Sequence, residues 1–221
     1  MTLDSSKALG GIGAILLFIG AITFFVEPFL AILGLIGIIL VLVALHDLAN
    51  NYKEGGIFKN ALFSFIAGIV GLVVTGITVV YLFFYTTILT DFLHVIYPTW
   101  NGDLSTLTGL TPDTSNITTS NSAPLLEAFF LALAVLWIFS IITAFFARRS
   151  LKVLSAKASV GLFSTAALLL LIGGFLTIVF IGFILMLIAV LLIAIAFFQI
   201  KPQPEQPVAT VVPSPSMPTP V

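Results

Sequence analysis

Residues 158–200 read ASVGLFSTAALLLLIGGFLTIVFIGFILMLIAVLLIAIAFFQI, without a single charged side chain. A membrane-spanning helix needs about 20 apolar residues, whereas one helix over this whole stretch would be about 65 Å long, roughly twice the hydrocarbon thickness of a bilayer. The segment must therefore fold back, and we expect the turn near Phe180–Gly182. This stretch predicts a hairpin of two membrane-spanning helices.

The rest of the chain has the same apolar character. Of its 221 residues, 60% are hydrophobic and 8% are charged, and the mean hydropathy is +1.25. A soluble domain carries about 25% charged residues. This composition excludes an ordinary water-soluble enzyme, a disordered chain and a nucleic-acid partner, which would require a basic surface. With no cysteine, it also excludes a disulfide framework and a thiolate nucleophile.

Four other apolar runs complete a set of six expected helices. Backbone polar groups in lipid must be satisfied within the protein, so only helices and closed barrels span membranes. None of the runs shows the period-two alternation of barrel strands. We therefore expect an all-α fold, a six-helix transmembrane bundle, with helices over about 8–26, 29–45, 61–85, 125–146, 160–180 and 182–198.

The basic residues all fall on one side of this arrangement. If the N-terminus lies inside, that side receives Lys7, Lys53, Lys59, Arg148, Arg149, Lys152, Lys157 and Lys201. The opposite side receives Glu27, Asp91, Asp103, Asp113 and Glu127. Lys and Arg in short loops near helix ends mark the cytoplasmic side of a membrane protein. We expect a multi-pass protein of the cell membrane with both termini in the cytoplasm.

The polar segments divide the chain into a transmembrane domain over 1–200 and a tail over 201–221. The tail holds seven of the eleven prolines, a composition typical of a disordered extension, here a cytoplasmic one. The long outer loop, about 86–124, contains Asn116-Ile117-Thr118, an N-glycosylation acceptor sequence on the expected outer face.

The first and last hairpins begin with similar sequences. Residues 5–11 read SSKALGG and residues 155–161 read SAKASVG, with Ser, Lys, Ala and Gly at matched positions. Both hairpins would enter from the cytoplasm, which predicts a parallel repeat that flanks a central helix pair. The alternative is that a Lys followed by small residues simply makes a good start for a helix.

No ionisable residue lies in the middle of an expected helix, so no proton or ion pathway is indicated. Glu27, Asp91, His94 and Glu127 lie near the outer boundary, where they form either an acidic mouth or four solvated rim residues. His46 lies on the opposite side of the bilayer from His94, so the two cannot share a metal ion. We expect no catalytic residue, no metal and no cofactor, and hence no enzyme.

The most regular pattern lies in the third expected helix. It consists of small or hydroxyl-bearing residues at spacings of 4, 3, 4 and 3: Ser64, Gly68, Gly71, Thr75 and Thr78. Such a stripe lets membrane helices approach closely, and we call it the helix-packing seam. The alternative is a solute path lined by Thr75 and Thr78, together with Ser140 and Thr143 of the next helix.

Three segments resemble a known family: SKALGGIG over 6–13, IFKNAL over 57–62, and SAK over 155–157 followed by LFSTA over 162–166. The family consists of small polytopic membrane proteins, mainly archaeal, and is catalogued as a domain of unknown function, number nine-nine-six. The resemblance covers about residues 3–200. It implies an integral membrane protein of archaeal type and supplies no activity, ligand or catalytic residue.

Two classes of function are consistent with these patterns. The first is a non-enzymatic structural or accessory component of a membrane assembly, favoured by the helix-packing seam and by the absence of charge within the expected helices. Its partners would be the lipid bilayer and either further copies of this chain or a larger membrane complex. The second is a channel or carrier for a small neutral solute, which would require a hydrated path.

Overall fold

The computed structural model describes residues 2–23 and 26–201, so the proline-rich tail beyond Lys201 lies outside the described residues. The helices are α1 (Leu3–Thr23), α2 (Ala31–Asn51), α3 (Gly55–Val80), α4 (Ile88–Ile96), α5 (Thr119–Ala158), α6 (Gly161–Leu176) and α7 (Ile181–Phe198). Shorter helical turns are η1 (Pro28–Leu30), η2 (Tyr81–Tyr85), η3 (Leu104–Gly109) and η4 (Thr177–Val179). The turn η2 is a π-helical continuation of α3.

Every regular element in the described residues is helical, which confirms the all-α fold class. Six of the helices are long and apolar enough to cross a membrane, and α4 is not among them. The six-helix transmembrane bundle expected from the apolar runs is therefore the observed architecture.

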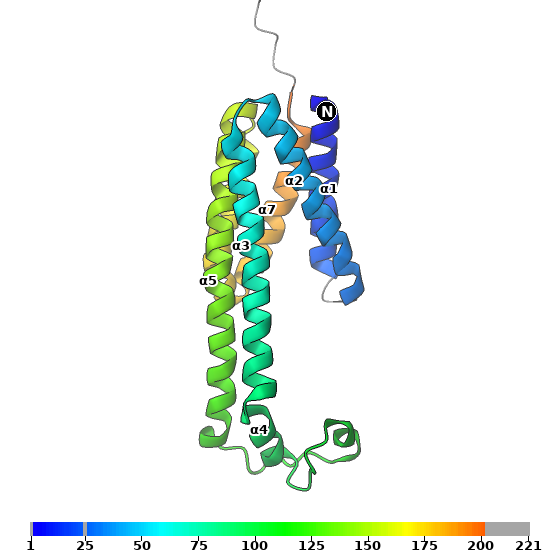
Figure 1. Cartoon of the computed structure of the whole chain (residues 1–221), viewed down its shortest axis with the longest axis vertical. Coiled ribbons are helices and arrows are strands. Elements are labelled where there is room, and N and C mark those ends of the chain that lie inside the picture. Colours follow the sequence, from blue (N-terminus) through cyan, green and yellow to red (C-terminus); the bar gives the residue numbers. More distant parts are fainter. Residues whose placement is uncertain (1, 24–25, 202–221) are drawn as a thin grey trace, which may run out of the picture.

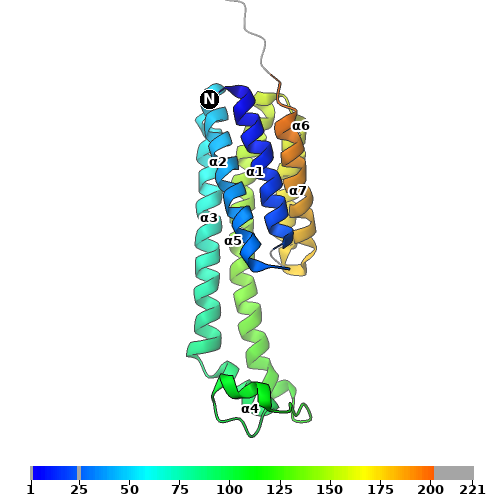
Figure 2. The same ribbon diagram turned by 90° about the vertical axis from the view of Figure 1, so that its right-hand side faces the viewer.

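The six long helices form a closed ring. α1 packs against α2 and α7, α3 packs against α2 and α5, and α6 packs against α5 and α7. The N-terminus and the last described residues lie at one end of the ring, and α4 with the loop around it lies at the other (Figures 1 and 2). The hairpins α1–α2 and α6–α7 both start at the end with the termini, so they run in the same direction.

Two of the six helices are much longer than the others. α5 has 40 residues and α3 with η2 has 31, or about 60 and 46 Å, whereas α6 has 16 residues, or about 24 Å. Figure 1 shows α3 and α5 continuing past the turn of the α1–α2 hairpin. The α3–α5 pair is therefore the axis of the molecule, and the two hairpins cover only the part of it nearest the termini.

The helices extend beyond the apolar runs. The segments 46–60 and 148–159, which lie between the expected helices, are mostly helical, because an apolar run marks the part of a helix in lipid while Lys, Arg, Ala and Leu continue the helix into water. The breaks fall at Lys53 and Ser159, both with positive φ, and Gly55-Gly56 open α3. Lys157 thus belongs to the last turn of α5, whereas its counterpart Lys7 lies within α1.

The tightly packed core lies at the end that carries the termini. Its largest fully buried side chains come from five of the six long helices: Leu48, Ile57, Leu154, Phe163 and Phe197. The rings of Phe163 and Phe197 meet edge to face with their centroids 5.2 Å apart. This core closes the ring at that end.

The α1–α2 hairpin is held by contact between glycines. A Cβ atom built on Gly20 would lie 2.3 Å from the backbone nitrogen of Gly34, and one built on Gly37 would lie 2.5 Å from the carbonyl oxygen of Gly13. At both crossings the neighbouring atoms belong to backbone, which cannot move aside as a side chain can. Small residues at a crossing allow membrane helices to approach this closely.

We expect Gly20→Ala to lower the stability of the chain. The added methyl group would overlap the backbone of Gly34, and overpacking of this kind costs about 1–3 kcal/mol. Thermal unfolding in detergent checks this, with Gly76→Ala as the control because a Cβ there meets nothing within 4 Å and brings the same gain in helix propensity. A Gly20→Ala protein as stable as the control would contradict the close crossing.

Candidate functional site

The part of the helix-packing seam nearer the termini, residues Ser64, Gly68 and Gly71, lies between α3 and α5. The hydroxyl of Ser64 donates a hydrogen bond to the backbone carbonyl of Thr143, with an O···O distance of 2.9 Å. A Cβ on Gly68 would lie 3.7 Å from the Thr143 side chain, an ordinary contact. A Cβ on Gly71 would lie 2.5 Å from the Cβ of Phe139, which is too close. The two helices therefore touch most tightly at Gly71.

The other two residues of the helix-packing seam, Thr75 and Thr78, make no hydrogen bond between helices. The hydroxyl of Thr78 donates to the carbonyl of Val74 in its own helix at 2.9 Å, so it makes no bond between helices. The hydroxyl oxygen of Thr75 is buried and has no hydrogen-bond partner among the described residues. The five seam residues thus combine three at the α3–α5 contact with two threonines that make no hydrogen bond to another helix.

Several bonds between helices come from residues outside the helix-packing seam. The Ser150 hydroxyl, fully buried, donates to the carbonyl of Ile57 at 2.7 Å, and the Ser140 hydroxyl reaches the carbonyl of Gly174 at 3.1 Å. The indole N–H of Trp137 donates to the carbonyl of Phe175 at 2.9 Å. Sequence reasoning missed Ser150 because it ended the fourth expected helix at about residue 146, whereas α5 continues to Ala158, and the helical register beyond Phe146 would have revealed this residue.

The four residues of the expected acidic mouth do not come together. Glu27 lies at the turn of the α1–α2 hairpin, whereas Asp91 and His94 lie on α4 at the far end of the α3–α5 pair (Figure 1). Glu127 is exposed on α5. Among the described residues no group of three or more His, Asp or Glu side chains could hold a metal ion. An acidic mouth would require the α1–α2 turn and α4 to lie at the same height along the bundle. The long α3–α5 pair instead carries α4 well beyond the α1–α2 turn.

The outer loop is more ordered than its composition suggests. It contains α4 and η3, and the Thr118 side chain caps the start of α5 in a reciprocal pair with Asn121. Hydrogen bonds from Ser105 hold the pKa of Asp103 below its ordinary value, and Ser115 does the same for Asp113. Asn116 is exposed beside Asp113, and its glycosylation stays a prediction.

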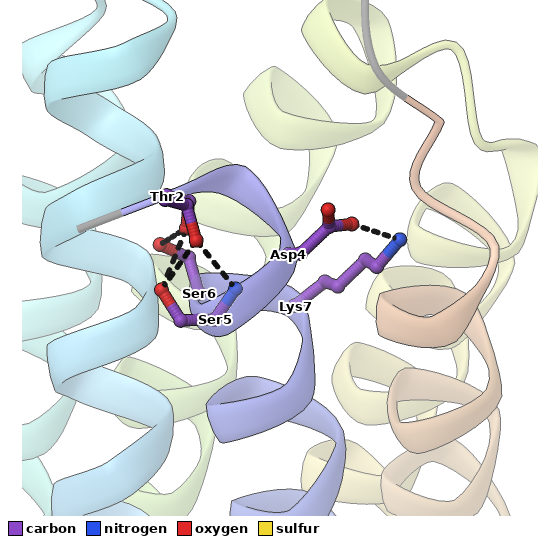
Figure 3. Close-up of polar contacts among 5 residues, drawn as sticks. All are labelled: Thr2, Asp4, Ser5, Ser6 and Lys7. Carbon is purple, nitrogen blue, oxygen red and sulfur yellow. Dashed lines mark hydrogen bonds and ion pairs between the residues drawn. The ribbon is translucent and has the colours of Figure 1, made fainter.

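The opposite end of the bundle carries the basic residues. The Lys7 ammonium lies 2.6 Å from the carboxylate of Asp4, in a first turn of α1 where Ser5 and Ser6 donate to the carbonyl of Thr2 (Figure 3). The Lys157 ammonium lies 3.4 Å from Glu54. Burial raises the pKa of the Tyr52 phenol at the same end.

All eight Lys and Arg residues lie at this end of the bundle, near the two termini, six on helices and two, Lys53 and Lys201, just outside them. Arg149 places its guanidinium 4.4 Å from the ring centre of Phe145, on the outer face of α5. Ion pairs at the surface such as Lys7–Asp4 contribute little to stability. What distinguishes these basic residues is that they all lie at one end of the bundle. The bundle has one basic end and one end without Lys or Arg.

We expect Gly71→Leu to lower the melting temperature in detergent or to disrupt assembly. Its side chain would meet Phe139 at less than van der Waals distance and separate α3 from α5. Gly76→Leu on the same helix is the matched control, because its side chain would project into open space. If the two variants unfold at the same temperature and keep the same oligomeric state, the seam does not hold α3 against α5.

Comparison with known proteins gives a family but no activity. A family model described as "Protein of unknown function (DUF996)" matches residues 33–191. The chain is 26% identical over 200 residues to the uncharacterized protein MJ1644 of the archaeon Methanocaldococcus jannaschii, covering 90% of this chain and 94% of that protein. No solved structure matches significantly. The resemblance noted in the sequence is confirmed: this multi-pass membrane protein belongs to the DUF996 family.

Proposed function

We propose that the chain is a non-enzymatic structural or accessory component of a membrane assembly. The observation that carries this proposal is the direction of the hydroxyl groups in the bundle. Ser64 and Ser150 each donate to a backbone carbonyl of a neighbouring helix, and Ser140 shares its proton between the carbonyl of Trp137 in its own helix and that of Gly174 in α6. These hydroxyl protons are therefore directed at backbone carbonyls and not at a hydrated path. Bonds of this kind contribute about 0.6 kcal/mol each in membrane proteins.

The α3–α5 pair offers a surface for partners. Beyond the level of the hairpins it exposes large apolar side chains on both helices: Ile77, Val80, Phe84, Leu126, Phe129 and Phe130. Within residues 2–23 and 26–201, no helix covers these faces, which leaves them to lipid, to further copies of this chain or to another membrane protein.

A specific observation favours the alternative, a channel or carrier for a small neutral solute. The hydroxyl oxygens of Thr75 and Thr143 are buried without a partner among the described residues. A hydrated path would satisfy both. The other two candidates of such a path already use their hydroxyl protons: Thr78 donates to the carbonyl of Val74, and Ser140 donates to the carbonyls of Trp137 and Gly174.

Solute uptake by proteoliposomes distinguishes the two functions. The accessory function predicts that liposomes containing the full chain take up glycerol and urea no faster than protein-free liposomes. Uptake above that background, reduced by Thr75→Val or Thr143→Val while the protein stays folded, would overturn the proposal in favour of the alternative. Cross-linking of Ile77→Cys in the native membrane adds a positive readout, since an assembly predicts adducts at this exposed position.

The proposed orientation places both termini in the cytoplasm of the cell membrane. It rests on the basic end of the bundle, because Lys and Arg flanking spans remain on the cytoplasmic side. We expect Asn51→Cys to be labelled by an impermeant thiol reagent only after the membrane is opened, and Asn116→Cys to be labelled in intact cells. The chain has no cysteine of its own, so no background labelling arises. The reverse pattern would invert the topology.

A further inference from the structure

The ring of six helices encloses a central cavity of about 320 Å³. All six membrane-spanning helices line it, through residues that include Leu17, Leu42, Phe65, Thr143, Leu170 and Ile193. An apolar cavity of 150 Å³ already stays dry and takes up a molecule such as benzene. This cavity is about twice that size, which places it at the lower end of the range for ligand sites.

The cavity is closed toward the end that carries the termini. On that side its lining includes Leu45, Leu151 and Ile193, and the fully buried Leu48, Leu154 and Phe197 lie one helical turn further on. These three side chains belong to the packed core. A ligand therefore cannot enter or leave through the basic end of the bundle.

The lining has almost no capacity to bind polar groups. The Ser64 and Ser150 hydroxyls, which border the cavity, already donate to the carbonyls of Thr143 and Ile57. Of the polar side chains in the lining, only the Thr143 hydroxyl lacks a partner in the described residues. One hydroxyl cannot give a water molecule the two to four partners it requires. The lining therefore selects an apolar ligand.

The cavity opens sideways, between α2 and α3. Leu35 and Leu72 line it, yet 60% and 68% of their surfaces are exposed, so both lie at its rim. Each belongs to the interior of a membrane-spanning segment, α2 and α3 respectively. Hydrocarbon of the bilayer surrounds a multi-pass protein at that depth. What meets the opening is therefore the tail region of the membrane lipids.

From the lateral opening and the apolar lining we infer that the cavity binds the hydrocarbon chain of a membrane lipid, which enters between α2 and α3. The volume holds about ten water-sized groups, enough for a large part of one chain. The site is independent of the proposed accessory role, because a channel or an accessory protein could each contain it.

A cavity-filling substitution tests this site. Gly68 borders the cavity, and a Cβ there makes only ordinary contacts, so Gly68→Leu would place its side chain in the cavity without displacing α5. The matched control is Gly76→Leu, whose side chain meets nothing. The full chain, stripped of lipid in detergent, is titrated with phosphatidylcholine, and its melting temperature is followed.

If the cavity binds a lipid chain, phosphatidylcholine should raise the melting temperature of the wild type by about 2–4 °C or more. The control variant Gly76→Leu should respond in the same way. Gly68→Leu should lose this response and, without lipid, should melt above Gly76→Leu because its cavity is filled. Equal responses in all three proteins would overturn the inference. If Gly68→Leu fails to fold, Gly68→Ala and Leu42→Phe reduce the same volume more gently.

Photocross-linking locates the bound chain. Phosphatidylcholine with a diazirine near the end of one tail should label lining residues such as Leu42 and Leu170 in the wild type, and label them several-fold less in Gly68→Leu. A detergent whose alkyl chain carries the same diazirine shows whether any hydrocarbon chain can occupy the cavity. Labelling of the lining by the lipid, while detergent competes for the cavity, supports a lipid site. Labelling confined to outward-facing residues such as Ile77, or labelling of the lining by the detergent alone, would overturn it.

Discussion

Close contact between helix backbones is the constraint on which this bundle depends. In lipid no hydrophobic force draws two apolar helices together, so association relies on packing and on a few hydrogen bonds. Gly20 meets Gly34, Gly182 meets Gly173, and Gly71 meets Phe139, all at distances that a methyl group would make impossible. These contacts hold the two hairpins and the central pair. The serine hydroxyls that bond to carbonyls lie where the backbones are already near each other.

The unequal lengths of the helices determine which parts of the central pair are covered. The α6–α7 hairpin turns at η4, where Trp137 of α5 bonds to the carbonyl of Phe175, and α5 continues beyond that level toward Thr119. The hairpins therefore cover the α3–α5 pair near the basic end only. The remaining apolar faces of α3 and α5 are exposed, and the same difference in length separates Glu27 from the residues on α4.

The sequence was sufficient to predict the six membrane helices, because each apolar run is long enough to span a bilayer and is bounded by charge or by a turn. It was not sufficient to predict where the helices end, since Arg148 and Lys152 continue α5 as readily as leucine does. Nor could it show the contact of Ser150 with Ile57, which lies 93 residues away in the chain. The acidic mouth failed for a related reason, because run lengths do not fix the relative depth of separate turns.

Gly68 and Gly71 show why a stripe of small residues cannot be interpreted from its spacing alone. They are three residues apart on one helix, and the sequence treats them alike. Gly71 lies against Phe139, where the absence of a side chain permits contact, whereas a Cβ on Gly68 would still lie 3.7 Å from Thr143, and Gly68 borders the cavity. At one position the missing side chain joins two helices, and at the other it leaves a space between them. The difference lies in how closely the two helices approach: the atom nearest to a Cβ on Gly71 is the Cβ of Phe139, at 2.5 Å, whereas a Cβ on Gly68 meets only the outer atoms of the Thr143 side chain, at 3.7 Å.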